Sequence, residues 1–317
     1  MEVKKVGIIG SGQVGTTIGT VWLNYGRTVV VSDIAEPILQ KARATIEGSL
    51  ERRVAKGDLS PAQKEETLKR LITTTNVSDL KDVDLVVEAA SENIAIKQKI
   101  FAELDAACSE KTILTTNSSS IPITTIAAAT KRQDRCAKMH FWYPATVMTY
   151  MEVSRGYLTS DDTWETVITL AKELGRKPIR IVKDYQGLGN QYLQWEMPPE
   201  GGLFWELMYG KTTLEEVEAR PKGKTPEGFD QVLNFMEMQD FIGLDTMLGI
   251  AESAVHEYGS ARSYPCPLLR RMVEAGHLGQ KTGIGFYDYS GSPRKAIMGK
   301  FSPYILAFLA KDEEFVT

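Results

Sequence analysis

The chain has 317 residues, a net charge of -4, 43% hydrophobic residues and 25% charged residues. This length exceeds that of a usual single core, so two domains are expected, and the nearly balanced charge argues against nucleic acid or an anionic membrane as a partner. The composition is typical of a cytoplasmic metabolic protein.

The three cysteines, Cys108, Cys136 and Cys266, are far apart and form no CxxC pair. That arrangement predicts neither a disulfide framework nor a zinc site, and we expect all three to be small buried side chains. No apolar run approaches the ~18 residues that a membrane-spanning helix requires. We therefore expect no metal and no membrane segment.

Short apolar runs and helical patterns alternate through the first half of the chain. Strands joined by helices in this way predict a doubly wound parallel sheet. The expected strands are residues 6–9, 28–32, 84–88 and 112–115, with two further extended segments near 137–141 and 149–153. The expected helices are residues 14–25, 36–55, a segment opening at Ser60-Pro61, and 96–108.

The character of the sequence changes after about Asp184. Helical periodicity dominates from there, so the second half is expected to be mainly α. The expected helices are residues 203–209, 213–219, 229–242 and 245–258, with a weak helical signal at 304–311.

A glycine motif follows the first expected strand. Gly10, Gly12 and Gly15 have GxGxxG spacing, with Gln13 and Val14 opening the next helix. The first glycine permits the tight turn, the second lets the backbone approach a pyrophosphate, and the third allows the helix to pack closely on the strand. The free amides at the helix start favour negative charge, so these five residues are expected to bind a dinucleotide.

Asp33 closes the second expected strand. A carboxylate there accepts a hydrogen bond from a ribose 2′-hydroxyl and repels a 2′-phosphate, which favours NAD over NADP. The expected fold is therefore α/β, with an N-terminal Rossmann-type doubly wound sheet in residues 1–184. A smaller, mainly α-helical C-terminal domain follows in residues 185–317.

An ordered series of motifs resembles the L-3-hydroxyacyl-CoA dehydrogenase family, which includes the 3-hydroxybutyryl-CoA dehydrogenases. The similarity is close to continuous from residue 4 to about residue 184. The motifs that carry it are residues 84–93, Lys97, Phe101, and residues 117–121, 132–135, 140–141, 241–246 and 279–287. The resemblance implies NAD-dependent oxidation of a (S)-3-hydroxyacyl-CoA to the 3-oxoacyl-CoA, or the reverse reduction.

His140 is the expected general acid/base, because the ordinary pKa of an imidazole suits proton exchange near neutral pH. A chain reversal near Pro144 would return Glu152 beside His140. The resemblance gives Glu152 the role of orienting the imidazole, and it gives the Ser119 hydroxyl a hydrogen bond to the reacting oxygen.

Further roles follow from the resemblance alone. It places Glu92, Lys97 and Asn117 near the cofactor. It places Arg53 and Lys56 over the coenzyme A portion of the substrate, with a helical second domain that closes the substrate cleft and forms a homodimer.

Two departures from the family pattern concern the substrate pocket. Tyr143 stands where the family usually has an asparagine that borders the active site. In residues 185–191 the family's proline is absent and one residue fewer precedes Asn190, the expected counterpart of the substrate-binding asparagine. Two alternatives therefore stay open: a dehydrogenase of a non-CoA 3-hydroxy acid, similar to gulonate or carnitine dehydrogenases, and a catalytically silent NAD-binding relative.

Overall fold

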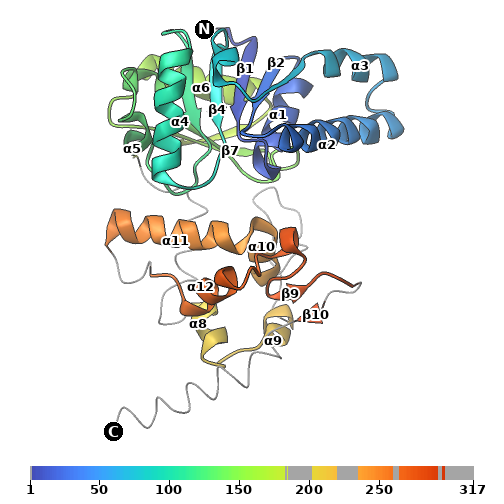
Figure 1. Ribbon diagram of the computed structural model, residues 1–317, viewed down its shortest axis with the longest axis vertical. Coiled ribbons are helices and arrows are strands. Elements are labelled where there is room, and N and C mark those ends of the chain that lie inside the picture. The colour runs from blue at the N-terminus through green and yellow to red at the C-terminus, as the bar shows by residue number, and fades with distance from the viewer. Residues whose placement is uncertain are drawn as a thin grey trace. The chain divides into compact units, whose positions relative to one another are not determined.

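The computed structural model describes residues 2–182, 184, 202–219, 235–259, 264–291 and 295–296. The chain divides into two compact units, Met1–Gly187 and Leu188–Thr317 (Figure 1). The second departure region, residues 185–191 with Asn190, and the weak helical signal at 304–311 lie outside the described residues.

The first unit is built on an eight-stranded sheet in the order β3-β2-β1-β4-β5-β6-β7-β8. All neighbouring pairs are parallel except β6 and β7, which are antiparallel. The strands are β1 Lys5–Ile9, β2 Thr28–Ser32, β3 Leu71–Thr74, β4 Leu85–Glu88, β5 Ile113–Thr116, β6 Cys136–Phe141, β7 Tyr150–Arg155 and β8 Lys177–Ile181. The predicted doubly wound, parallel-dominated sheet is confirmed.

Helices cover both faces of this sheet (Figure 1). The buried side chains of α1, α2 and α6 pack with one face in a core that contains Trp22, Leu39 and Trp164. Those of α4 and α5 pack with the other face around Phe101 and Ile126. The helices are α1 Gln13–Asn24, α2 Glu36–Ala55, α3 Pro61–Lys69, α4 Ile94–Ala107, α5 Ile123–Ala127 and α6 Asp161–Glu173. Short 3-10 turns are η1 Val77–Leu80 and η2 Gln133–Arg135.

Local sequence signals explain where α3 begins. Ser60 is its N-cap, the Ser60 hydroxyl accepts from the Gln63 amide at 3.2 Å, and the Gln63 side chain accepts from the Ser60 amide at 2.8 Å. This capping box and Pro61 in the first turn together favour a helix start at this point.

The second unit is mainly helical among its described residues, as predicted. Its elements are α8 Leu203–Met208, α9 Leu214–Ala219, α10 Phe235–Ile242, α11 Leu244–Tyr258, α12 Pro267–Glu274, the turn η4 Gln280–Thr282 and a small hairpin of β9 Tyr287–Asp288 with β10 Lys295–Ala296. One buried carboxylate connects α10 with the motif of residues 279–287: Asp240 accepts from the amides of Phe286 and Tyr287 at 2.9 and 3.0 Å. A Cβ on Gly279 or Gly285 would meet Asp240 at 2.2 or 2.1 Å, so both positions require glycine for this close approach.

Within the described ranges, no helix is long and apolar enough to cross a membrane. The same ranges contain no group of three or more His, Cys, Asp or Glu side chains that could hold a metal ion.

Candidate active site

The glycine loop joins β1 to α1 at the carboxyl edge of the sheet. Gly10 has φ +89°, and a Cβ on it would lie 2.7 Å from the Ala89 carbonyl oxygen. A Cβ on Gly15 would lie 1.8 Å from the Gly10 carbonyl oxygen, so this glycine is required for helix and loop to pack. Gly12, by contrast, faces open space, with nothing within 4 Å of an added Cβ.

The start of α1 is suited to an anion. No side chain caps it, and its first turn contains no acidic residue. Gln13 is exposed and Val14 is partly buried beside it. Free backbone amides, the helix dipole and the open space at Gly12 together fit a pyrophosphate group.

Asp33 lies at the end of β2 and contacts the glycine loop directly. One of its carboxylate oxygens accepts from the amide and hydroxyl of Ser11 at 2.6 and 2.8 Å, and the other accepts from the Ile34 amide at 2.7 Å. These bonds fix the carboxylate at the position where Rossmann-type proteins bind the adenosine ribose. The structure therefore brings together the glycine loop and Asp33, which the sequence predicted to bind a dinucleotide. Their arrangement fits NAD.

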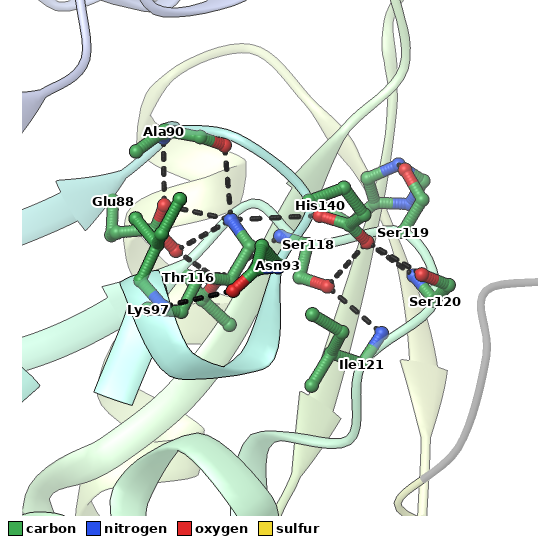
Figure 2. Close-up of polar contacts among 12 residues, drawn as sticks. Glu88, Ala90, Asn93, Lys97, Thr116, Ser118, Ser119, Ser120, Ile121 and His140 are labelled. Carbon is green, nitrogen blue, oxygen red and sulfur yellow. Dashed lines mark hydrogen bonds and ion pairs between the residues drawn. The ribbon is translucent and has the colours of Figure 1, made fainter. Parts of the chain in front are cut away.

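His140 and Glu152 face each other across the β6–β7 hairpin. They are paired residues in its antiparallel register, and His140 Nδ1 lies 3.2 Å from Glu152 Oε2. This confirms that the chain reversal returns Glu152 beside the imidazole. The other imidazole nitrogen, Nε2, lies 2.9 Å from the Ser119 hydroxyl (Figure 2).

The carboxylate of Glu152 is fully buried and ionised. Burial acts to raise the pKa of Glu152, but the hydrogen bond and charge of His140, the Trp142 indole and the Lys138 cation outweigh it and hold this pKa below its ordinary value. An ionised carboxylate only accepts hydrogen bonds, so His140 must donate from Nδ1. In the neutral imidazole, Nε2 is then an acceptor, and the Ser119 hydroxyl donates to it.

Lys138 lies on the same face of β6 as His140, two residues earlier, and is fully buried. Burial lowers its pKa, while the carboxylates of Asp184, Glu92 and Glu152 act in the opposite direction. The Asp184 carboxylate itself accepts from the first two amides of α5, those of Ile123 and Thr124.

The loop that presents Ser119 is fixed by a carboxylate on the neighbouring connection. Glu92 Oε1 accepts from the Ser118 hydroxyl at 2.6 Å and from the amide and hydroxyl of Ser120 at 2.8 and 2.7 Å. Burial acts to raise the pKa of Glu92, but the Lys97 charge and these serine donors hold it at about 2. Both neighbours of Ser119 are therefore anchored to one anion.

Lys97, which was expected near the cofactor, supports the same loop from beneath. Its side chain is 1% exposed, and its ammonium donates to both oxygens of Glu88 at 2.7 and 2.9 Å and to the Ala90 carbonyl at 3.1 Å (Figure 2). Glu92 lies 3.5 Å away. An ammonium has three donors, and these contacts use them within the chain.

The remaining predicted residues fall into separate places. Asn117 follows β5 at the carboxyl edge of the sheet, and its side-chain oxygen accepts from the Phe141 amide at 2.8 Å. Tyr143 lies just beyond β6 and is partly buried, which raises its pKa. Arg53 donates to Asn24 at 2.6 Å, at the last residue of α1 and hence at the opposite edge of the sheet from Ser119. Lys56 is exposed at the end of α2.

Sequence reasoning missed two functional candidates. Glu88 is fully buried at the end of β4, where it accepts from Lys97, from Thr116 Oγ1 at 2.6 Å and from the Ala90 amide at 2.7 Å. Its position directly after the apolar residues of β4 was the sequence signal that could have identified it. Trp142 donates its indole N–H to Glu152 Oε1 at 2.9 Å, and no sequence pattern indicated that contact.

The fold and these contacts define an NAD-dependent oxidoreductase with a Rossmann-type cofactor unit and a His–Glu pair at the carboxyl edge of its sheet. Residues 5–185 match the NAD-binding domain of 3-hydroxyacyl-CoA dehydrogenase, and residues 210–289 match the C-terminal domain of that enzyme. The chain belongs to the 3-hydroxyacyl-CoA dehydrogenase family.

Individual relatives match over nearly their full length. The chain is 36% identical over 286 residues to the 3-hydroxybutyryl-CoA dehydrogenase of Clostridioides difficile, which covers 90% of this chain and 99% of that one. It is 37% identical over 291 residues to the 3-hydroxybutyryl-CoA dehydrogenase of Bradyrhizobium diazoefficiens, covering 92% and 97%. Among solved structures, the (S)-3-hydroxybutyryl-CoA dehydrogenase PaaH1 from Ralstonia eutropha has a TM-score of 0.75 and 36% identity, covering 92% of this chain and 100% of that one.

Proposed function

We propose that this protein oxidises a (S)-3-hydroxyacyl-CoA to the 3-oxoacyl-CoA with NAD, and catalyses the reverse reduction. The observation that carries the proposal is the Ser119–His140–Glu152 chain of contacts, which lies at the same sheet edge as the glycine loop and Asp33. Relatives at 36% and 37% identity are 3-hydroxybutyryl-CoA dehydrogenases, which supports a CoA thioester as substrate.

In the oxidation, His140 Nε2 takes the proton of the substrate hydroxyl. Bound NAD supplies the hydride acceptor for the carbon that carries this hydroxyl. Glu152 holds the Nδ1–H tautomer and stabilises the imidazolium that forms, in the way that a buried carboxylate assists a catalytic histidine elsewhere. Ser119, which donates to Nε2 in the free protein, turns its hydroxyl to the reacting oxygen when substrate replaces it.

The proposed substrate contacts lie in several parts of the chain. We retain Arg53 and Lys56 as the proposed coenzyme A contacts and Asn190 as the proposed substrate-binding amide, on the family resemblance. Glu92, Lys97 and Asn117 are proposed to border the cofactor, because all three shape the loops at its edge of the sheet. Tyr143 is proposed to narrow the acyl pocket, since a phenol ring is larger than the amide the family usually has there.

The proposal is tested by NADH oxidation with acetoacetyl-CoA, in parallel with free acetoacetate and with a His140→Ala variant. Turnover of the thioester alone, lost by a factor of ~100 or more in the variant while NADH still binds, is the expected result. Turnover of the free acid alone would replace the thioester with a non-CoA 3-hydroxy acid. NADH binding without turnover of either would instead favour a catalytically silent relative.

Assembly and cellular location are two further proposals. A homodimer follows from the family resemblance of the helical second unit, and light scattering on the full chain tests it. A cytoplasmic location is the proposal that fits the composition.

A further inference from the structure

The two oxygens of the Glu152 carboxylate have different partners. Oε2 lies 3.2 Å from His140 Nδ1, and Oε1 accepts from the Trp142 indole nitrogen at 2.9 Å. Glu152 is fully buried, so water cannot replace a lost donor easily. The indole therefore supplies half of the direct side-chain hydrogen bonding that the described structure shows for this anion.

The hairpin places Trp142 for this contact. His140 and Trp142 lie two residues apart, on the same face of the chain. The Trp142 amide donates to the Tyr150 carbonyl at 3.3 Å, two residues beyond the His140–Glu152 pair. The Trp142 ring packs on Tyr150, with ring centroids 5.5 Å apart. The ring is thus held by the hairpin, and its N–H points diagonally at Glu152.

We propose that Trp142 is a positioning residue for the His140–Glu152 pair. By fixing Oε1, the indole prevents the carboxylate from rotating, so Oε2 stays aimed at His140 Nδ1. As a donor it also stabilises the ionised carboxylate against burial. This inference rests on the proposed function for its kinetic consequence, but the contact itself can be tested without turnover.

The first measurement is made on the indole N–H signals of the ¹⁵N-labelled full chain. The Trp142 signal is assigned by its loss in Trp142→Phe, and it should shift upfield in Glu152→Gln, because an amide oxygen is a weaker acceptor than a carboxylate. Trp22 is the matched reference, since its indole nitrogen is buried with no hydrogen-bond partner among the described residues. A Trp142 signal that moves no more than that of Trp22 would overturn the proposal, whatever the enzyme turns over.

The second measurement is kinetic. Trp142→Phe keeps a ring against Tyr150 and removes the donor, so kcat should fall about tenfold, the size of effect expected for one hydrogen bond to a charged group. KM should change by less than about twofold, because the proposal gives the indole no contact with the substrate. The same substitution in a Glu152→Gln background should cost little more, since the indole acts through Glu152.

The control is Trp22→Phe, which removes the same ring atoms from a fully buried site in α1 without removing a hydrogen bond. We expect lower thermal stability and an unchanged kcat. If Trp142→Phe behaves like this control, or if its effect on kcat adds fully to that of Glu152→Gln, Trp142 only packs the hairpin and the proposal fails. If wild-type protein turns over no thioester, the proposed function fails while the indole signals still decide the role of Trp142.

Discussion

Replacing Lys97 with methionine tests the buried network that holds the Ser119 loop. Methionine keeps an unbranched chain of similar length but removes the ammonium, which leaves Glu88 and Glu92 without their cation. Removing one partner of a buried ion pair typically destabilises a protein by ~3–5 kcal/mol. Glu88 keeps its bond from Thr116, and Glu92 keeps those from Ser118 and Ser120, so the loss should lie near the lower end, about 3 kcal/mol.

The pH dependence of this loss has a definite sign. The pKa of Glu92 is held at about 2 in the folded protein, against an ordinary 4.5, so its contribution to stability is fully present above pH 4.5 and disappears as the pH falls towards 2. Lys97 supplies the largest charge effect that lowers this pKa. The difference between wild type and Lys97→Met should therefore be greatest above pH 5 and narrow as the pH falls below 4.5.

The assay is urea unfolding followed by circular dichroism at several pH values. Lys99→Met is the matched control, because Lys99 lies on the same helix with a 78% exposed side chain and should change the unfolding free energy by less than ~0.5 kcal/mol. A loss for Lys97→Met no larger than that of the control, or one that grows as the pH falls, would refute the reasoning.

Three further predictions concern the glycine loop, Asp33 and Asp240. Gly12→Ala should leave thermal stability unchanged and weaken NADH binding, measured by fluorescence. Gly15→Ala should lower the free energy of unfolding by ~1–3 kcal/mol, because its Cβ would overlap the loop backbone. Equal melting temperatures for the two variants would contradict this prediction. Asp33→Asn should weaken NADH binding about tenfold and reduce the preference for NADH over NADPH, as titrations with both cofactors would reveal. Burial raises the pKa of Asp240 to about 6, although the amides of Phe286 and Tyr287 donate to it. Wild type should therefore lose stability relative to Asp240→Asn as the pH rises from about 4 to 6. A stability difference between the two proteins that stays constant across this range would contradict the prediction.

Local patterns were sufficient to predict most of the first unit. The apolar runs predicted β1, β2, β4 and β5, and the α2 boundaries agree with residues 36–55. Strand β8 was not predicted, because it is a partly exposed edge strand without a buried apolar run. Strand β3 was also missed, since it is only four residues long and directly follows α3.

Parts of the candidate site could likewise be predicted from residues close together in the sequence. The glycine spacing and Asp33 are sequence features whose chemistry depends on one strand–turn–helix unit, so the sequence alone indicated a dinucleotide site. The single reversal between His140 and Glu152 was also short enough to infer. Both depend on neighbours along the chain.

Only the tertiary structure decided what surrounds the His–Glu pair. The pairing of β4, β5 and β6 places Glu88 opposite Thr116 and Thr116 opposite Lys138. The hydrophobic periodicity of the sequence does not indicate which strands will be neighbours in the sheet. Lys97 looks like an ordinary helix-surface charge until the sheet buries it against Glu88. The sequence by itself therefore indicated the cofactor and the histidine that we propose as the acid/base, while burial and strand order decided which charged side chains surround them.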